Sequence, residues 1–137
     1  MNKITISLVV FVTLVGVLYF FDQAKESPAY NAVTKAEMVA LQQKAAAYFT
    51  KFGTYGSLAG SCSATIGVFA TPEISRSISK IQKFSNHSPI CRSSEQLWAV
   101  SIELRSEDGF FCVDSTGFSG GVAGIIIDPG CASVKIP

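Results

Sequence analysis

The sequence predicts an α+β fold in which one long N-terminal helix packs against a small antiparallel β-sheet. Apolar residues fit a helix from Ile4 to Phe52, first as a continuous run and then as a stripe. From Trp98 the apolar residues alternate instead, and the turn sequence Asp108-Gly109 follows. The chain has 137 residues, which leaves one domain of the usual size after the apolar run.

The segment from Ile4 to Phe21 contains no charged residue and no proline. As a helix rising about 1.5 Å per residue it is about 27 Å long, close to the roughly 30 Å hydrocarbon core of a bilayer. We therefore expect residues 1–28 to form a transmembrane anchor that contacts lipid and neighbouring helices. The residues assigned to this membrane and assembly surface are Ile4, Leu8, Phe11, Leu14, Leu18 and Phe21.

A cleaved secretory signal and a buried core helix are the alternatives. Lys3 suits a signal, but no small-residue cleavage site closely follows Phe21. A domain this small could hardly surround a helix that is apolar on all sides. Lys3 before the run, and the net negative charge of residues 22–26 after it, predict a single-pass protein of the inner (cytoplasmic) membrane. Its N-terminus would be cytoplasmic, and residues 29–137 would be extracytoplasmic.

The net charge of +1 gives no electrostatic reason to expect binding to nucleic acid. An even number of cysteines in a small exported domain predicts two disulfides, and none is spaced as C-x-x-C, the spacing of zinc-ribbon or thioredoxin-like sites. Four cysteines allow three pairings. Because they close loops of moderate length, each contributing roughly 2–4 kcal/mol, we prefer the pairs Cys62–Cys91 and Cys112–Cys131.

Proline disfavours helical geometry, so Pro28 is expected to interrupt or bend the first helix. A second helical pattern covers about residues 30–52 and should end at Gly53, a residue suited to a left-handed cap. This helix is amphipathic, and its apolar stripe should be buried against the rest of the chain. The stripe consists of Val33, Met38, Leu41, Ala45, Tyr48, Phe49 and Phe52.

A short helix and three strands are expected after the loop that delivers Cys62. Residues 74–84 form the helix, residues 98–104 and 110–113 form a hairpin, and residues 122–127 form a third apolar run. Residues 86–89, Asn-His-Ser-Pro, are expected to form a loop that leads to Cys91. Packing of the sheet on the long helix would join Trp98, Val100, Ile102 and Leu104 to Leu41, Tyr48 and Phe52.

The sequence offers little evidence for catalysis, and the protein is not predicted to be an enzyme or to hold a cofactor. Residues 117–121 match the G-x-S-x-G string around Ser119, with His87 and Asp114 as formal partners, but that motif requires a strand-to-helix turn and a later histidine. Three acidic residues at turns lack the spacing of a calcium loop, so no metal site is predicted: Asp108, Asp114 and Asp128. The glycosylation string at residues 86–88 is short enough to arise by chance.

Two segments resemble the type IV pilins and pseudopilins of bacteria. Residues 48–56, Tyr-Phe-Thr-Lys-Phe-Gly-Thr-Tyr-Gly, are similar to the aromatic helix end and following loop of those proteins. Residues 97–101, Leu-Trp-Ala-Val-Ser, and residues 111–117, Phe-Cys-Val-Asp-Ser-Thr-Gly, resemble their C-terminal hairpin, with Phe111 at the usual tryptophan position. The resemblance implies a pilin-like fold and a role as structural subunit or minor component of a type IV pilus or secretion pseudopilus. The implied partners are the bilayer, other pilin-like subunits and the pilus assembly machinery. The resemblance also adds a cell-surface filament as the other location for residues 29–137.

The N-terminus differs from the pilin pattern. Pilin precursors are cut after a glycine by prepilin peptidase, and a glutamate shortly after it guides assembly. Here Asn2 or Lys3 stands at the glycine position, and Ser7 or Leu8 stands at the acidic position. This difference leaves a second hypothesis, a membrane-anchored pilin-like domain that does not polymerise and binds a partner through the loops of its sheet.

Overall fold

A computed structural model describes the backbone of residues 3–57, 60–107 and 109–135, and the side chains of these residues from Pro28 onward. The fold is α+β, with one long helix and a four-stranded antiparallel sheet. The helices are α1 (Lys3–Phe52), the 3-10 helix η1 (Val68–Ala70) and α2 (Pro72–Ser85). The strands are β1 (Ile90–Ser93), β2 (Trp98–Glu103), β3 (Phe110–Asp114), β4 (Ser119–Val122), β5 (Ile125–Ile126) and β6 (Val134–Lys135).

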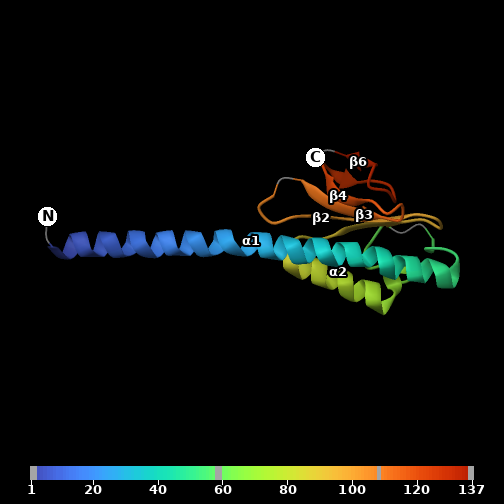
Figure 1. The fold of residues 1–137 in the computed structure, drawn as a ribbon, viewed down its shortest axis with the longest axis horizontal. Coiled ribbons are helices and arrows are strands. Elements are labelled where there is room, and N and C mark those ends of the chain that lie inside the picture. The colour runs from blue at the N-terminus through green and yellow to red at the C-terminus, as the bar shows by residue number, and fades with distance from the viewer. Residues whose placement is uncertain (1–2, 58–59, 108, 136–137) are drawn as a thin grey trace.

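The first half of α1 extends away from the rest of the chain, whereas its second half packs against α2 and β3 (Figure 1). The helix has 50 residues and continues through Pro28, so the expected interruption is absent. Proline removes only one backbone N–H, and Pro28 is exposed, so its ring faces solvent rather than a neighbouring element. The helix ends as expected at Gly53, whose φ is 70° and whose N–H donates to the carbonyl of Phe49 at 2.7 Å.

The four-stranded sheet has the order β1-β2-β3-β4, and every neighbouring pair is antiparallel. The predicted hairpin is present as β2 and β3, with Val100 opposite Val113. Residues 122–127 were expected to form one strand, and this prediction is wrong. β4 begins earlier and includes Gly120, while β5 pairs with β6 in a separate two-stranded sheet. Gly120 suits this strand because the ring of Phe118 occupies the space that a side chain would need.

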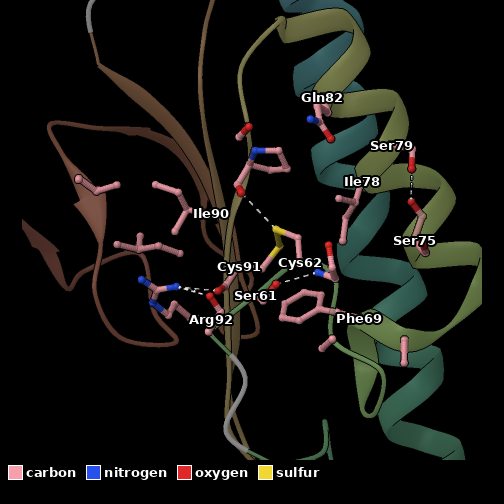
Figure 2. A pocket seen from close by; sticks show the side chains of 18 of the residues that line it. Ser61, Cys62, Phe69, Ser75, Ile78, Ser79, Gln82, Ile90, Cys91 and Arg92 are labelled. Carbon is pink, nitrogen blue, oxygen red and sulfur yellow. Dashed lines mark hydrogen bonds between the residues drawn. A yellow bond between two sulfur atoms is a disulfide. The ribbon is translucent and has the colours of Figure 1, made fainter.

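Strand β1 at the edge of the sheet was not predicted, whereas the loop expected at residues 86–89 is present just before it. The strand pairs with β2 from Ile90 opposite Ser101 to Ser93 opposite Trp98. The Cys62–Cys91 disulfide joins this strand to the loop after α1, with a Cα–Cα distance of 5.0 Å (Figure 2). The second disulfide, Cys112–Cys131, joins β3 to the C-terminal segment. These are the two pairs that the loop lengths favour in the sequence.

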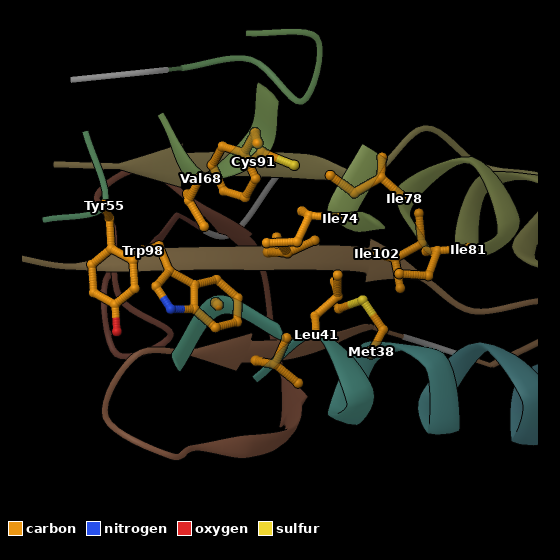
Figure 3. Close-up of a cluster of buried hydrophobic side chains, with 14 of the residues drawn as sticks. Met38, Leu41, Tyr55, Val68, Ile74, Ile78, Ile81, Cys91, Trp98 and Ile102 are labelled. Carbon is orange, nitrogen blue, oxygen red and sulfur yellow. The ribbon is translucent and has the colours of Figure 1, made fainter. Parts of the chain in front are cut away.

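The main core lies between the second half of α1, α2 and β2 (Figure 3). Trp98 and Ile102 of β2 contact the helix side, as expected, and Leu41 is buried there. Val33 and Phe52 were expected in the buried stripe, but 44% and 52% of their surfaces are exposed. Val33 lies on the opposite side of α1 from the buried residues, whereas Phe52 is on the buried side but is the last residue of the helix. The face of α2 predicted from the isoleucine spacing is fully buried: Ile74, Ile78 and Ile81.

The loop after α1 crosses the segment before η1 at two glycines, which allows a stability prediction. A Cβ on Gly56 would lie 2.6 Å from the Cα of Gly67, and φ of Gly56 is 105°. Gly56→Ala should therefore lower the free energy of unfolding by about 2–4 kcal/mol, through left-handed strain and overpacking together. Gly53→Ala is the control, since it has a φ of 70° but nothing within 4 Å, and should cost about 1–2 kcal/mol. Denaturant unfolding of the full chain gives the measurement. Equal losses of unfolding free energy in the two variants would show that the two segments do not cross closely at Gly56.

Candidate functional site

The second half of α1 has two faces of opposite character. One face is buried against α2 and the sheet, and its members follow one another at steps of three and four residues, as one side of a helix requires. The buried residues are Asn31, Thr34, Met38, Leu41 and Ala45. This face fixes the helix to the rest of the domain and leaves the opposite face without a neighbour in the described part of the chain.

We call the opposite side the outer face. Its residues are also spaced by three or four positions, and all of them are exposed. None carries a charge, and most have small side chains. They are Ala29, Ala32, Val33, Ala36, Val39, Gln43, Ala46, Ala47 and Thr50. Thr50 donates its hydroxyl to the carbonyl of Ala46, so its polar group is satisfied within the helix. The outer face is thus a long, uncharged surface on which another helix can approach closely.

Three of the four charged residues of this part of α1, Lys35, Glu37 and Lys44, are held along its sides by ion pairs. The fourth, Lys51, is exposed near the end of the helix, with its ammonium 5.1 Å from the centre of the Phe52 ring. The Lys35 ammonium lies 3.1 Å from the Glu107 carboxylate, and the hydrogen bonds from Lys35 and Asn31 lower the pKa of Glu107. Glu37 lies 3.2 Å from the Lys44 ammonium. Burial tends to raise the pKa of Glu37, but hydrogen bonds from Ser77 and Lys44 and the nearby ammonium groups outweigh it, so the pKa is lowered. These ion pairs hold the charges of Lys35, Glu37 and Lys44 away from the outer face.

Several polar and ring contacts fix the globular domain to α1 just after Pro28. The side-chain amide of Asn31 donates to the carbonyl of Arg105 at 2.8 Å, and its oxygen accepts the N–H of Arg105 at 2.9 Å. The guanidinium of Arg105 lies 4.3 Å from the centre of the Tyr30 ring, which also contacts Phe84. The β2–β3 turn is thereby fixed to the helix, and the part of α1 before these contacts is the part that extends beyond the domain.

Six residues were predicted to form the membrane and assembly surface. Their backbone belongs to α1, but their side chains lie outside those that the structure describes: Ile4, Leu8, Phe11, Leu14, Leu18 and Phe21. Among the described residues, no helix combines the length and the apolar character needed to cross a membrane. The anchor predicted for residues 1–28 therefore stays a prediction.

The formal catalytic residues have separate structural roles. Ser119 lies on β4 opposite Val113, and His87 lies near α2, with its Nδ1 3.5 Å from a Glu103 carboxylate oxygen. The Asp114 carboxylate is occupied by hydrogen bonds to its own turn and to the N–H of Cys131. Asp108 lies outside the described residues, and in the described part of the chain no three histidine, cysteine or acidic side chains are grouped to hold a metal ion.

Sequence reasoning did not identify the outer face. Its alanines also favour helix formation wherever they occur, so their composition alone does not mark a surface. The usable signal was their period, because Ala29, Ala36 and Ala47 share one side of the helix and lie opposite the buried stripe. Comparison of the chain with models of known protein families, with curated proteins and with solved structures finds no match.

Proposed function

We propose that the protein is a structural subunit or minor component of a type IV pilus or secretion pseudopilus, and that it assembles through its N-terminal helix. In this proposal residues 1–28 first anchor the chain in the cytoplasmic membrane and then pack among the helices of neighbouring subunits. The rest of the chain is extracytoplasmic and faces outward. The partners are the bilayer, other pilin-like subunits and the pilus assembly machinery.

The observation that carries the proposal is the single helix α1, which continues through Pro28 and extends beyond the domain. From Lys3 to Ala29 it reaches about 40 Å at about 1.5 Å per residue. The sequence of this part includes the uncharged run from Ile4 to Phe21. Leaving such a run in water is unfavourable by about 25 cal/mol for each Å² of apolar surface. Lipid, or the helices of sister subunits, would remove that surface from water.

The outer face supports the same proposal, because it is a second uncharged surface on α1, separated from the run Ile4 to Phe21 by the charged segment of residues 22–26. Small residues such as Ala36 and Ala47 let two helix backbones approach closely, and the gain comes from packing rather than from charge. The domain itself is braced by two disulfides, which suits an oxidising space outside the cytoplasm. In this arrangement the protein contributes adhesion between helices and carries out no chemistry.

The proposal is tested by placing a charge on the outer face. Ala36→Arg should reduce the amount of protein in sheared surface filaments at least tenfold, while the protein stays in the membrane fraction. The reason is that an unpaired arginine between packed helices costs several kcal/mol, and 1.4 kcal/mol already corresponds to a factor of ten. Immunoblots of the sheared and membrane fractions of the native host give the measurement.

Ala132→Arg is the matched control, because Ala132 is an exposed alanine of the C-terminal segment and lies off α1. It should leave the sheared fraction unchanged, and both variants should unfold at the temperature of the unmodified protein, since both sites are on the surface. Filament levels of Ala36→Arg equal to those of Ala132→Arg would show that the outer face is not a subunit contact.

The second candidate is a membrane-anchored pilin-like domain that does not polymerise. The observation in its favour is the sequence around Ser7 and Leu8, where the glutamate that guides pilin assembly has no counterpart. Under this alternative the unmodified protein would be found only in the membrane fraction, and Ala36→Arg would not change its distribution. The same fractionation therefore separates the two candidates.

A further inference from the structure

An open groove of about 800 Å³ lies at the edge of the sheet, on a surface that the proposed assembly does not use. It extends from α2 past the Cys62–Cys91 disulfide (Figure 2). Its lining also includes β5 and Lys135. Its volume is within the range of natural ligand sites, which is about 300–1,000 Å³. Aliphatic side chains such as Ile78 and Ile90 form its apolar part.

Hydroxyl and amide groups line the groove on the α2 side and along the loops. Five serines contribute to it, and all five are exposed: Ser61, Ser63, Ser75, Ser79 and Ser88. The exposed side-chain amide of Gln82 also faces the groove and has no hydrogen-bond partner in the described part of the chain. A hydroxyl can both donate and accept a hydrogen bond, and the amide adds two donors and an acceptor. The Ser79 hydroxyl already donates to the Ser75 carbonyl and the Ser61 oxygen accepts the N–H of Ser63, so Ser79 offers a ligand an acceptor and Ser61 a donor. This wall suits a ligand that itself carries many hydroxyl groups.

The other end of the groove is cationic. The Arg92 guanidinium is fixed by three backbone carbonyls, since Nε donates to Ile127 at 3.2 Å and Nη1 donates to Gly60 at 2.9 Å and Cys91 at 3.0 Å. Its Nη2 has no partner among the residues that the structure describes. Lys135 is exposed and also lines the groove. Among the residues that the structure describes, no carboxylate lines the groove, and a fixed guanidinium with a free donor is well suited to bind an anionic group.

We propose that this groove binds an acidic saccharide. Its carboxylate would contact Arg92 and Lys135, and its ring hydroxyls would face the serines and Gln82. An extended acidic peptide fits less well, because peptides usually bind a sheet edge through free backbone groups. Here the edge strand β1 is covered by the segment around Cys62, which the disulfide holds 5.0 Å from Cys91 between Cα atoms. The side chains of the groove therefore provide the available hydrogen bonds.

The test uses the full chain in detergent micelles and measures affinity by calorimetry, with chemical-shift changes to locate the contact. The probes are a galacturonic-acid tetrasaccharide, its methyl ester, and a tetraglutamate peptide of similar charge. The acidic saccharide is expected to bind at least ten times more tightly than either comparison probe. The methyl ester keeps the hydroxyls without the charge, whereas the peptide keeps the charge without the hydroxyls.

Two variants locate the site without disturbing the fold, because both residues are exposed. Lys135→Ala and Ser79→Ala should each weaken binding of the acidic saccharide about three- to tenfold, as expected for loss of one partner of a hydrogen bond. Lys51→Ala, at an exposed cation on α1 outside the groove, should leave the affinity unchanged. Equal binding of the peptide, no binding of the saccharide, or equal loss in Lys51→Ala would each overturn the proposal. None of these outcomes bears on filament assembly.

Discussion

Trp98→Ala is expected to lower the free energy of unfolding by about 3–5 kcal/mol, the range for removal of a large core side chain. Trp98 is 1% exposed and lies at the centre of the main core, where its ring contacts Tyr55 edge-on with 6.4 Å between ring centroids. At about 4–8 °C per kcal/mol for a domain of this size, the midpoint of thermal unfolding should fall by at least about 12 °C. Scanning calorimetry or near-ultraviolet circular dichroism of the full chain gives the measurement.

The preceding residue provides the control, because Leu97 is 44% exposed while Trp98 is buried. Leu97→Ala should change the stability by no more than about 0.5 kcal/mol. Trp98→Phe should cost less than about 2 kcal/mol, since it also removes the buried Nε1–H, which has no hydrogen-bond partner in the structure. A similar loss for Leu97→Ala and Trp98→Ala would show that β2 does not face the core as described.

The core around β2 could be predicted because local pattern and burial agree there. Large apolar residues alternate from Trp98 to Ile102, and the partner strand follows a strong turn sequence. The same agreement made α2 predictable from Ile74, Ile78 and Ile81, all of which are buried. In α2 one face contacts the core and the other faces solvent, so the period of the sequence carries the information. β2 is instead buried on both faces from Trp98 to Ile102, because Ala99 packs in a second cluster with Cys112, Ile126 and Cys131, and its alternation marks large against small side chains.

The elements that were missed or placed wrongly lie where the local sequence pattern and the tertiary contacts disagree. Strand β1 has only four residues and exists because β2 lies beside it. β4 contains Gly120 and Gly121, residues that weaken a strand in isolation, and it depends on pairing with β3. Phe52 fits the helical stripe but lies at the last residue of α1, beyond the part that α2 and the sheet cover.

The two functional surfaces differ in how far the sequence could reveal them. The outer face has a period that can be read from the chain, once the buried side of α1 is known. The groove could not be predicted in this way, because it brings together Gly60, Arg92 and Ile127 through contacts between three separate segments. The cationic end of the groove forms only because the fold brings β1, the segment after β5 and the loop after α1 together.

Asp114→Ala should lower the free energy of unfolding by about 3 kcal/mol or more. Asp114 is 4% exposed, and its carboxylate accepts hydrogen bonds from the backbone N–H groups of Thr116, Phe118 and Cys131 and from the Thr116 hydroxyl. Removal of the carboxylate leaves the buried N–H of Cys131 unpaired, which costs about 1–3 kcal/mol. It also breaks the three partly buried bonds from Thr116 and Phe118, each contributing about 0.5–1.5 kcal/mol. Denaturant unfolding of the full chain at pH 7 gives the measurement, with the exposed residue Asp128 changed to asparagine as the control.

The pH dependence of the lost unfolding free energy tests whether the charged carboxylate of Asp114 causes the loss. Burial tends to raise the pKa of Asp114, but the hydrogen bonds from Thr116, Cys131 and Phe118 outweigh it, and the pKa in the folded protein is lowered. The unfolded chain, with a pKa of roughly 3.9, therefore binds the proton more readily than the folded protein. The stabilisation is complete above that value and is lost as the pH falls through the folded pKa.

The difference in unfolding free energy between the unmodified protein and Asp114→Asn should therefore be largest near pH 7 and should shrink as the pH falls below about 4. Using this difference cancels the contributions of Glu37 and Glu107, whose pKa values are also lowered in the folded state. One oxygen of the Asp114 carboxylate accepts from Thr116 and Phe118, and the other accepts from Cys131. An asparagine amide has only one oxygen. The variant therefore also loses the hydrogen bond to Cys131, which holds the C-terminal segment on β3. A difference that stays constant from pH 7 to pH 3 would mean that packing, rather than the charged carboxylate, stabilises this turn.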